Sequence, residues 1–134
     1  MEEKELIRIA TKARERAYAP YSHFSVGAAL LTKSGRVFQG ANIENVSFRL
    51  TMCAEQAAVC AALAEGERDF VEIAVVADSK EPVVPCGACR QVLAEFSPEM
   101  KIVMSNLDGR SQTLNLSELL PRPRQGILES TRNV

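Results

Sequence analysis

The sequence predicts an α/β fold of three layers, α/β/α, in which helices cover both faces of a mixed sheet of roughly five strands. Three observations lead to this prediction. The length of 134 residues suits one domain with one core. Segments with helical spacing alternate with short apolar segments typical of strands, in the order α-β-β-α-β-α-β-β-α. No repeat, low-complexity stretch or linker divides the chain, so residues 1–134 are expected to form a single domain.

The first part of the chain predicts a helix followed by a hairpin. Residues 3–18 place apolar side chains at helical spacing with charges between them, and Pro20 ends the helix. Residues 26–31 are a nearly continuous apolar run typical of a buried strand, and residues 37–41 form a second strand. Because Ser34-Gly35 between the two favours a tight turn, we expect an antiparallel hairpin.

The rest of the chain predicts three helices and three strands. Residues 52–65 are rich in alanine and are followed by Gly66, which favours a helix that stops there. Further helices are predicted at residues 86–96 and 117–120, each ended by a proline. The predicted strands are residues 71–77, 101–105 and 111–114.

Composition argues against several classes of partner. Hydrophobic residues make up 46% and charged residues 25% of the chain, as in an ordinary globular protein, and the net charge is −1. No run of lysine or arginine forms a basic stripe, so we expect no nucleic-acid partner. No apolar stretch approaches the roughly 20 residues that cross a bilayer. The acidic N-terminus is no signal peptide, so we expect no membrane partner and a cytoplasmic location.

Cysteines carry the most specific signal in the sequence. In a chain without an export signal, free thiolates are a better interpretation than disulfides. Cys53, Cys86 and Cys89 together would hold one Zn²⁺ with three ligands and leave the fourth position open, as catalytic zinc sites do. Cys53 and Cys86 are expected to begin helices, where backbone N–H groups and the helix dipole favour thiolates. Glu55, two residues from a ligand, is placed to move protons for a water on that zinc.

Other interpretations of the cysteines stay open. A structural zinc would need a fourth ligand, for which Cys60 and His23 are the candidates. Cys60 follows Cys53 by seven residues, which is ~10 Å along a helix and too far to share one ion. We therefore interpret Cys60 as a small core residue. A redox pair of Cys86 and Cys89 would leave the segment Cys53-Ala54-Glu55 unexplained.

These segments resemble the small homotetrameric, zinc-dependent cytidine deaminases. Cys-Ala-Glu followed by Pro-Cys-Gly-Ala-Cys is similar to the zinc signature of nucleobase deaminases, and residues 19–30, 40–45 and 117–121 are also family hallmarks. The resemblance covers residues 5–121. It implies a single cytidine deaminase-like catalytic domain, one zinc per subunit and a homotetramer. The implied activity is hydrolytic deamination of cytidine and deoxycytidine to uridine and deoxyuridine, a step of pyrimidine salvage.

The resemblance also implies roles for residues around the zinc. Glu55 would pass protons from the attacking water to the base and to the departing amine. Phe24 would pack on the base, Asn42 and Glu44 would bind the ribose hydroxyls, and Ala54 belongs to the same substrate-binding set. Alternatives from the residues alone are that Phe24 is simple core and that Asn42 and Glu44 cap a turn.

The sequence departs from the family pattern around the site. Gln56 stands where the family usually has arginine, and it can donate a hydrogen bond to a thiolate without neutralising charge. Val46, Phe48 and Arg49 fall where relatives make contacts across subunits. No aromatic residue follows Phe96, whereas relatives place a phenylalanine soon after the equivalent of Pro121. Ile127 and Leu128 are the candidates to replace it.

These departures lead to a hypothesis and leave three competing functions. A more open pocket would tolerate N4-substituted cytidines, whereas simple drift would leave the preference for cytidine and deoxycytidine. A deaminase of a cytosine-containing antibiotic of the blasticidin type shares the metal motif, but residues 42–45 favour an ordinary ribose. Editing of RNA or DNA is disfavoured because basic surface is missing. In a zinc-stabilised binding module without catalysis, Glu55 would be dispensable.

Overall fold

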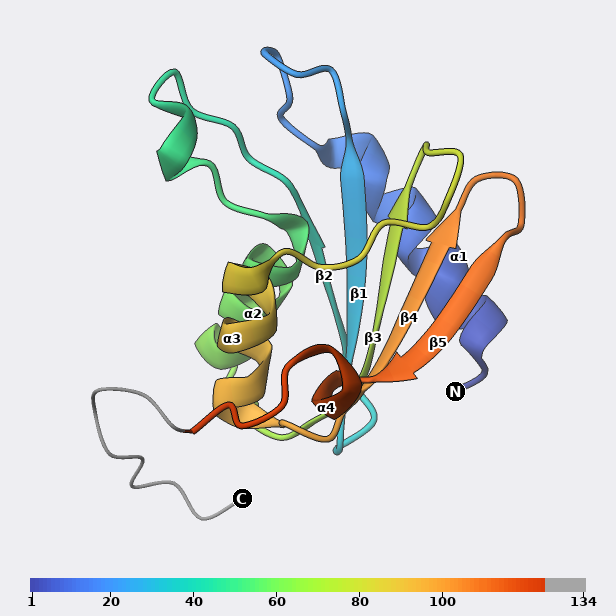
Figure 1. The fold of residues 1–134 in the computed structure, drawn as a ribbon, viewed down its shortest axis with the longest axis vertical. Coiled ribbons are helices and arrows are strands. Elements are labelled where there is room, and N and C mark those ends of the chain that lie inside the picture. The colour runs from blue at the N-terminus through green and yellow to red at the C-terminus, as the bar shows by residue number, and fades with distance from the viewer. Residues whose placement is uncertain (125–134) are drawn as a thin grey trace.

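A computed structural model describes residues 1–124 of the chain (Figure 1). The elements follow the predicted order, and two short 3₁₀ helices are added, η1 (Arg14–Arg16) and η2 (Phe48–Leu50). The main elements are α1 (Glu3–Ala13), β1 (Val26–Thr32), β2 (Val37–Ala41), α2 (Ala54–Ala64), β3 (Phe70–Ala77), α3 (Gly87–Phe96), β4 (Lys101–Asn106), β5 (Ser111–Asn115) and α4 (Leu116–Leu119).

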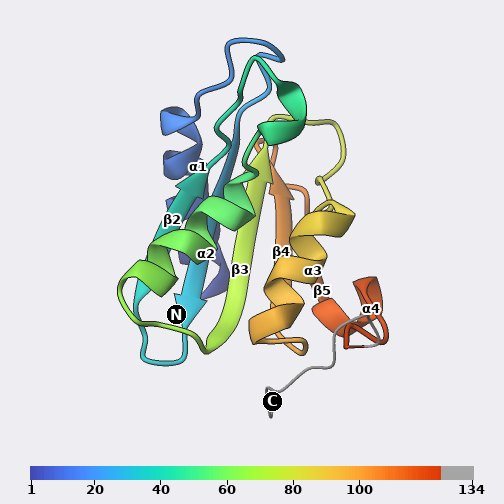
Figure 2. The ribbon, with the colours of Figure 1, turned by 90° about the vertical axis from the view of Figure 1, so that its left-hand side faces the viewer.

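The five strands form one mixed sheet in the order β2-β1-β3-β4-β5. Among the strand pairs of residues 1–124, only β3–β4 is parallel, while β1–β2, β1–β3 and β4–β5 are antiparallel. Helix α1 covers one face of the sheet, and α2 and α3 lie side by side on the other (Figure 2). The predicted three-layer α/β/α fold with a mixed sheet of five strands is therefore confirmed.

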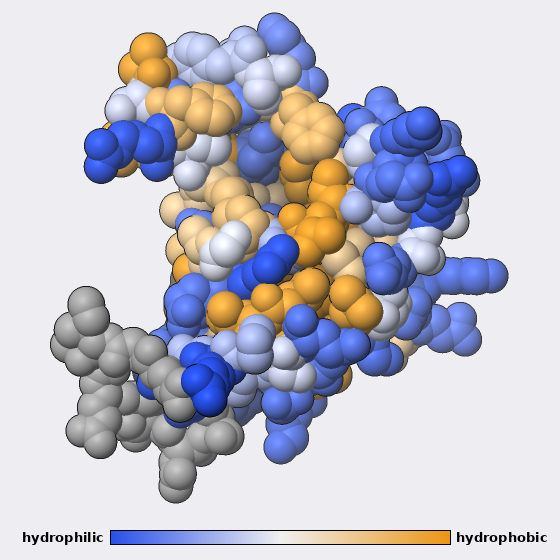
Figure 3. Space-filling model, viewed as in Figure 1, coloured by the Kyte–Doolittle hydropathy of each residue, from blue (hydrophilic) through white to orange (hydrophobic). Residues whose placement is uncertain are grey.

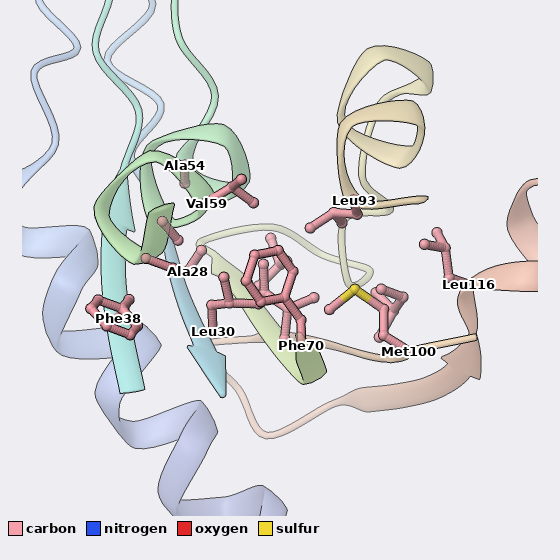
Figure 4. Close-up of a cluster of buried hydrophobic side chains, with 14 of the residues drawn as sticks. Ala28, Leu30, Phe38, Ala54, Val59, Phe70, Leu93, Met100 and Leu116 are labelled. Carbon is pink, nitrogen blue, oxygen red and sulfur yellow. The ribbon is translucent and has the colours of Figure 1, made fainter. Parts of the chain in front are cut away.

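Each face of the sheet has its own apolar core. Along β3, Ile73 and Val75 belong to the larger core beneath α2, α3 and α4, and Ala74 and Val76 belong to the smaller core beneath α1. Figure 4 shows part of the larger core, in which Phe70 lies among side chains from the strands and both helices. Because residues 73–77 of β3 are buried on both faces, this part of the strand appears in the sequence as a continuous apolar run.

Two glycines let a helix lie close against the hairpin. A Cβ at Gly27 of β1 would stand 2.0 Å from the carbonyl oxygen of Ala10 in α1. A Cβ at Gly40 of β2 would stand 2.3 Å from the carbonyl oxygen of Ala54, at the start of α2. No other residue type fits these contacts without displacing the helix backbone. Gly40 therefore fixes the position at which α2 begins.

The structure corrects two predictions from the sequence. The first helix was expected to extend to residue 18 but ends at Ala13, and η1 follows it. Tyr18 instead lies in extended backbone and donates its N–H to the carbonyl of Asn42 at 2.9 Å. The prediction that Cys60 is a core residue is wrong, since Cys60 is exposed on α2.

Residues 1–124 contain no helix that is both long and apolar enough to cross a membrane.

Candidate active site

A cavity of about 300 Å³ lies where α2 and α3 begin. At this end of the molecule, the segments around residues 18–24 and 43–52 extend beyond the sheet (Figure 1). The space-filling view in Figure 3 shows the hollow beneath the second of these segments. The cavity is lined by Ser22, Phe24, Val26, Asn42, Glu44, Phe48, Thr51, Cys53, Ala54, Glu55, Val75, Val83, Val84 and Cys86.

Three cysteines converge at one wall of this cavity. Cys53 is the N-cap of α2, Cys86 is the N-cap of α3, and Cys89 lies in the first turn of α3. The three Sγ atoms lie within 4.8 Å of one another, and those of Cys86 and Cys89 are 3.3 Å apart. The backbone N–H of Cys89 donates to the Cys86 sulfur at 3.4 Å, as expected at the start of a helix. Both helices thus begin at the predicted cysteines, and their N-termini bring the three cysteines together.

This donor set fits a zinc ion. Thiolates are the ligands that zinc shares with few other metals, and a set of three leaves one position for water or substrate. Within residues 1–124, neither His23 nor Cys60 belongs to a group of potential metal ligands. His23 is exposed in the loop before β1, and Cys60 is exposed farther along α2. The structural-zinc alternative with either residue as fourth ligand is therefore not supported.

Glu55 lies in the first turn of α2, beside the cysteines and in the same cavity wall. Its side chain is buried, with only 5% of the residue exposed. Burial raises the pKa of the Glu55 carboxyl to about 7, and the negative charge at Cys53 adds to this rise. A carboxyl with a pKa near neutrality can both take up and release protons at physiological pH. The geometry and the pKa together suit Glu55 to proton transfer.

Hydrogen bonds around the sulfurs stabilise negative charge on Cys53. A hydrogen bond from Cys89 lowers the pKa of the Cys53 thiol to about 6. The same interaction raises the pKa of Cys89. Gln56 donates from its Nε2 to the Cys89 sulfur at 3.5 Å, so it contacts the metal centre as a neutral donor. The helix N-termini stabilise each thiolate further, by ~0.3–1 kcal/mol.

Asn42 and Glu44 are buried, line the cavity and hold the loop that precedes β1. The Glu44 carboxylate accepts hydrogen bonds from the N–H groups of Tyr21 and Ser22, at 3.0 and 3.1 Å, and from the Ser22 hydroxyl. Asn42 accepts from the N–H of Val26 at 2.9 Å and donates to the carbonyl of Phe24 at 2.9 Å. Asn42 and Glu44 therefore stabilise the loop before β1, as one interpretation of the sequence expected. Both residues also face the cavity.

The same loop places Phe24 in the wall of the cavity. The N–H of Phe24 donates to the Ser22 hydroxyl at 3.0 Å, and His23 between them has a left-handed φ of 58°. Phe24 is 39% exposed, so the interpretation of Phe24 as simple core is wrong. An exposed aromatic ring in a cavity wall is available to pack on a flat ligand.

The residues expected at subunit contacts lie on the segment between β2 and α2. Val46 and Arg49 are exposed, with Val46 exposed to 83%. Phe48 is 56% exposed and contributes to the cavity of its own chain. Ile127 and Leu128, the candidates to replace an aromatic residue in the tail, lie outside the described residues.

Six lining residues were not assigned to the site by the sequence analysis: Ser22, Val26, Thr51, Val75, Val83 and Val84. Val83 and Val84 come shortly before Cys86, so their proximity to a metal ligand was a usable signal. Ser22 and Thr51 had no such signal, because their position depends on how two loops pack at one end of the sheet. The lining is mostly apolar, with few polar groups, as in typical small-ligand pockets.

Comparisons with known proteins agree with this site. Residues 1–105 match the family model described as the cytidine and deoxycytidylate deaminase zinc-binding region. A cytidine deaminase from Halalkalibacterium halodurans is 58% identical over 122 residues, covering 90% of this chain and 92% of that protein. A blasticidin-S deaminase from Bacillus cereus is 32% identical, covering 96% of this chain and 92% of that protein. The crystal structure of cytidine deaminase from Burkholderia pseudomallei superposes with a TM-score of 0.88 at 48% identity, covering 90% of this chain and 98% of that one.

Proposed function

This chain belongs to the cytidine deaminase family of zinc-dependent hydrolases, and on that premise we propose that it converts cytidine and deoxycytidine to uridine and deoxyuridine. The observation that carries the proposal is the placement of the buried Glu55 and the three cysteines in the wall of one cavity. The alternative of an antibiotic deaminase is supported less, because identity to the blasticidin-S deaminase is 32% against 58% for the cytidine deaminase.

The proposed reaction replaces the amino group at C4 of the base with oxygen from water and releases ammonia. Cys53, Cys86 and Cys89 would hold a zinc ion, which when bound would lower the pKa of a water to near neutrality and so make it a nucleophile. Glu55 takes the proton that the water loses and delivers protons to N3 of the base and to the leaving amine. Its raised pKa lets the same carboxyl act as base and then as acid.

Substrate binding is assigned to residues of the cavity wall. Phe24 packs on the base, Ala54 belongs to the surface that receives it, and Asn42 and Glu44 bind sugar hydroxyls. Lysine and arginine are absent from the described lining, which holds the carboxyl groups of Glu44 and Glu55. This charge pattern favours an uncharged nucleoside over a nucleotide, since a phosphate would meet negative charge without a cation.

We propose a cytoplasmic homotetramer as the working form. The outer side of α2 is apolar, with Cys60, Leu63 and Ala64 exposed. The segment between β2 and α2 exposes Val46 to 83% and Leu50 to 67%. Exposed apolar surface of this kind is typical of contacts between subunits. Light scattering of the zinc-loaded protein tests the proposal, with the mass of four chains as the expected result.

The variant Glu55→Gln tests the proposed chemistry. Glutamine keeps the size of the side chain but cannot accept a proton, so turnover of cytidine is expected to fall by ~10²–10⁴-fold. Zinc content, measured by atomic emission, is expected to stay at one per chain. The matched control is Glu95→Gln, at an exposed position of α3. This variant should convert cytidine at the rate of the unmodified protein. Full activity of Glu55→Gln would contradict the proposal and favour a zinc-stabilised binding module.

The wider tolerance for N4-substituted cytidines stays a prediction. Incubation with N4-acetylcytidine under the same conditions tests it. Hydrolysis at C4 would give uridine and acetamide without ammonia, so uridine is the product to follow. Absence of uridine from this compound, with uridine formed from cytidine, would restrict the proposed range to cytidine and deoxycytidine.

A further inference from the structure

Arg90 bridges two parts of the chain next to the metal centre. It follows the ligand Cys89 on α3, and its side chain is partly buried. Nε of Arg90 donates to the carbonyl of Pro85 at 2.8 Å, and Nη1 donates to the carbonyl of Leu119 at 3.1 Å. One guanidinium thus joins the residue before the ligand Cys86 to the end of α4. The rigid fork of arginine suits such a bridge better than the single ammonium of lysine.

The acceptor on α4 belongs to a firmly anchored element. Leu116 at the start of α4 is fully buried in the larger core. Asn115 and Glu118 form a capping box, in which the N–H of Asn115 donates to the Glu118 carboxylate at 2.7 Å. Leu119, in the last turn, has a carbonyl that is free of α-helical pairing. Arg90 therefore reaches from α3 to a fixed point.

The acceptor at Pro85 belongs to a segment without regular structure. Residues 78–86 connect β3 to α3 and carry the exposed N-cap ligand Cys86. The beginning of this segment is held by Asn106, whose Nδ2 donates to the carbonyls of Ser79 and Lys80 at 3.0 and 2.9 Å. Its end is held by Arg90 through Pro85. Because Cys86 follows directly, the bond at Pro85 limits where the Cys86 sulfur can lie.

We infer that Arg90 is a positioning residue for the metal centre. It holds the backbone before Cys86 against α4 and so keeps the Cys86 sulfur within reach of Cys53 and Cys89. The inference rests on the zinc site of the proposed function but not on the identity of the substrate. It predicts that loss of the guanidinium weakens metal binding more than it weakens the fold.

The test compares Arg90→Ala and Arg90→Lys with the matched control Arg36→Ala. Arg36 is an exposed arginine whose partners, Glu65 and Glu67, lie at 3.3 and 3.8 Å and away from the metal centre. Zinc affinity is measured by competition with a chromophoric chelator. Arg90→Ala is expected to bind zinc ~10–100-fold more weakly, the usual loss when a group supporting a ligand is removed. The zinc affinity of Arg90→Lys should fall by a smaller factor, and that of Arg36→Ala should equal the affinity of the unmodified protein.

Two further readouts separate positioning from general stabilisation. Cobalt substituted for zinc reports ligand geometry through its visible absorption, which Arg90→Ala should alter and Arg36→Ala should not. The rise in Tm on adding zinc should be smaller in Arg90→Ala, while the Tm of the metal-free protein changes less. Unchanged zinc affinity and an unchanged cobalt spectrum in either folded Arg90 variant would overturn the inference, whatever the Tm. If Arg90→Ala does not fold, Arg90→Lys supplies the same comparison.

The outcome of the Arg90 test can be distinguished from the outcome of the test of the proposed function. A protein that binds zinc but forms no uridine would contradict the substrate proposal and leave the role of Arg90 intact. A protein that binds no zinc at all would contradict both.

Discussion

The Glu44 carboxylate has two partners in the loop before β1 and one side facing the cavity. A carboxylate offers about four acceptor positions, and three are occupied by Tyr21 and Ser22. The hydrogen bonds to this loop lower the pKa of Glu44, so the group is ionised at neutral pH. One acceptor position is left for a hydroxyl of the nucleoside. Glu44 can therefore order the loop and bind the sugar in the same state.

Substitution of Ser22 and Glu44 separates these two roles. Ser22→Ala removes two loop hydrogen bonds, the one to the Glu44 carboxylate and the one from the N–H of Phe24, and is expected to raise KM for cytidine a few-fold. Glu44→Ala removes the loop contacts and the sugar contact together, so KM should rise by ~10-fold or more, since a hydrogen bond to a charged group contributes about 1.5–3 kcal/mol. Both should affect KM more than kcat, because the contacts are made before and during reaction. Equal KM values for the two variants, by steady-state assay, would restrict Glu44 to the loop.

At the residue level, the metal centre could be predicted and the pocket walls only in part. Cys53, Glu55, Cys86 and Cys89 stand in short local motifs whose spacing and helix starts determine their geometry. Ser22 and Arg90 act through partners 22 and 29 residues away in the chain. No local pattern encodes such contacts. They follow from the fold, which is why sequence inspection alone did not assign them.

The position of α2 depends on the glycine beneath its first turn. Gly40 on β2 faces the backbone of Ala54 and Ala58, while Gly27 on β1 faces Ala10 of α1 and Arg14 of η1. Both contacts exclude a Cβ, but only α2 carries Cys53 and Glu55. The two glycines are thus structurally alike and functionally different.

Gly27→Ala and Gly40→Ala are therefore a matched pair of variants. Each should destabilise the protein by ~1–3 kcal/mol, because the helix must move to admit the methyl group. Gly40→Ala should also weaken zinc binding and lower turnover per folded molecule, whereas Gly27→Ala should leave both near the unmodified values. Urea denaturation gives the stability, and chelator competition gives the zinc affinity. Equal zinc affinity in the two variants would contradict the link between Gly40 and the site.

At the level of elements, the order was predictable and two details were not. The α-β-β-α-β-α-β-β-α order follows from apolar periodicity and from glycine and proline breaks. The end of α1 was missed because residues 14–18 keep helical spacing, while Tyr18 pairs with the backbone after β2. The exposure of Cys60 was missed because α2 is apolar on all sides, so no polar face indicates which side meets solvent.

Across the whole molecule, a buried carboxyl lies on the face of the sheet opposite the cysteines. Glu72 of β3 shares its face with the smaller core beneath α1, and its Oε2 has no hydrogen-bond partner within the described residues. Burial raises the pKa of Glu72 above 4.5. Lys101 and the N-terminal amine lower it, and Glu3 raises it. The folded state therefore holds this proton to higher pH than the unfolded state does.

The sign of the resulting pH dependence is determined by linkage. Where the folded state binds more protons, stability falls as pH rises, from about 4.5 through the raised pKa of Glu72. Between pH 5 and 8, the Tm of the zinc-loaded variant Glu72→Gln should fall less than the Tm of the unmodified protein. The difference is expected to be on the order of a few degrees. At pH 8 it should be at least as stable as the unmodified protein. A Tm difference independent of pH would contradict this role of Glu72, and Glu95→Gln serves as control.

The most direct test of the central claim is formation of uridine from cytidine by the zinc-loaded protein. Uridine and ammonia are expected in equal amounts, with activity lost on removal of zinc by a chelator and restored when zinc is returned. A protein that holds one zinc per chain, keeps the buried Glu55 and still forms no uridine would contradict the proposed function.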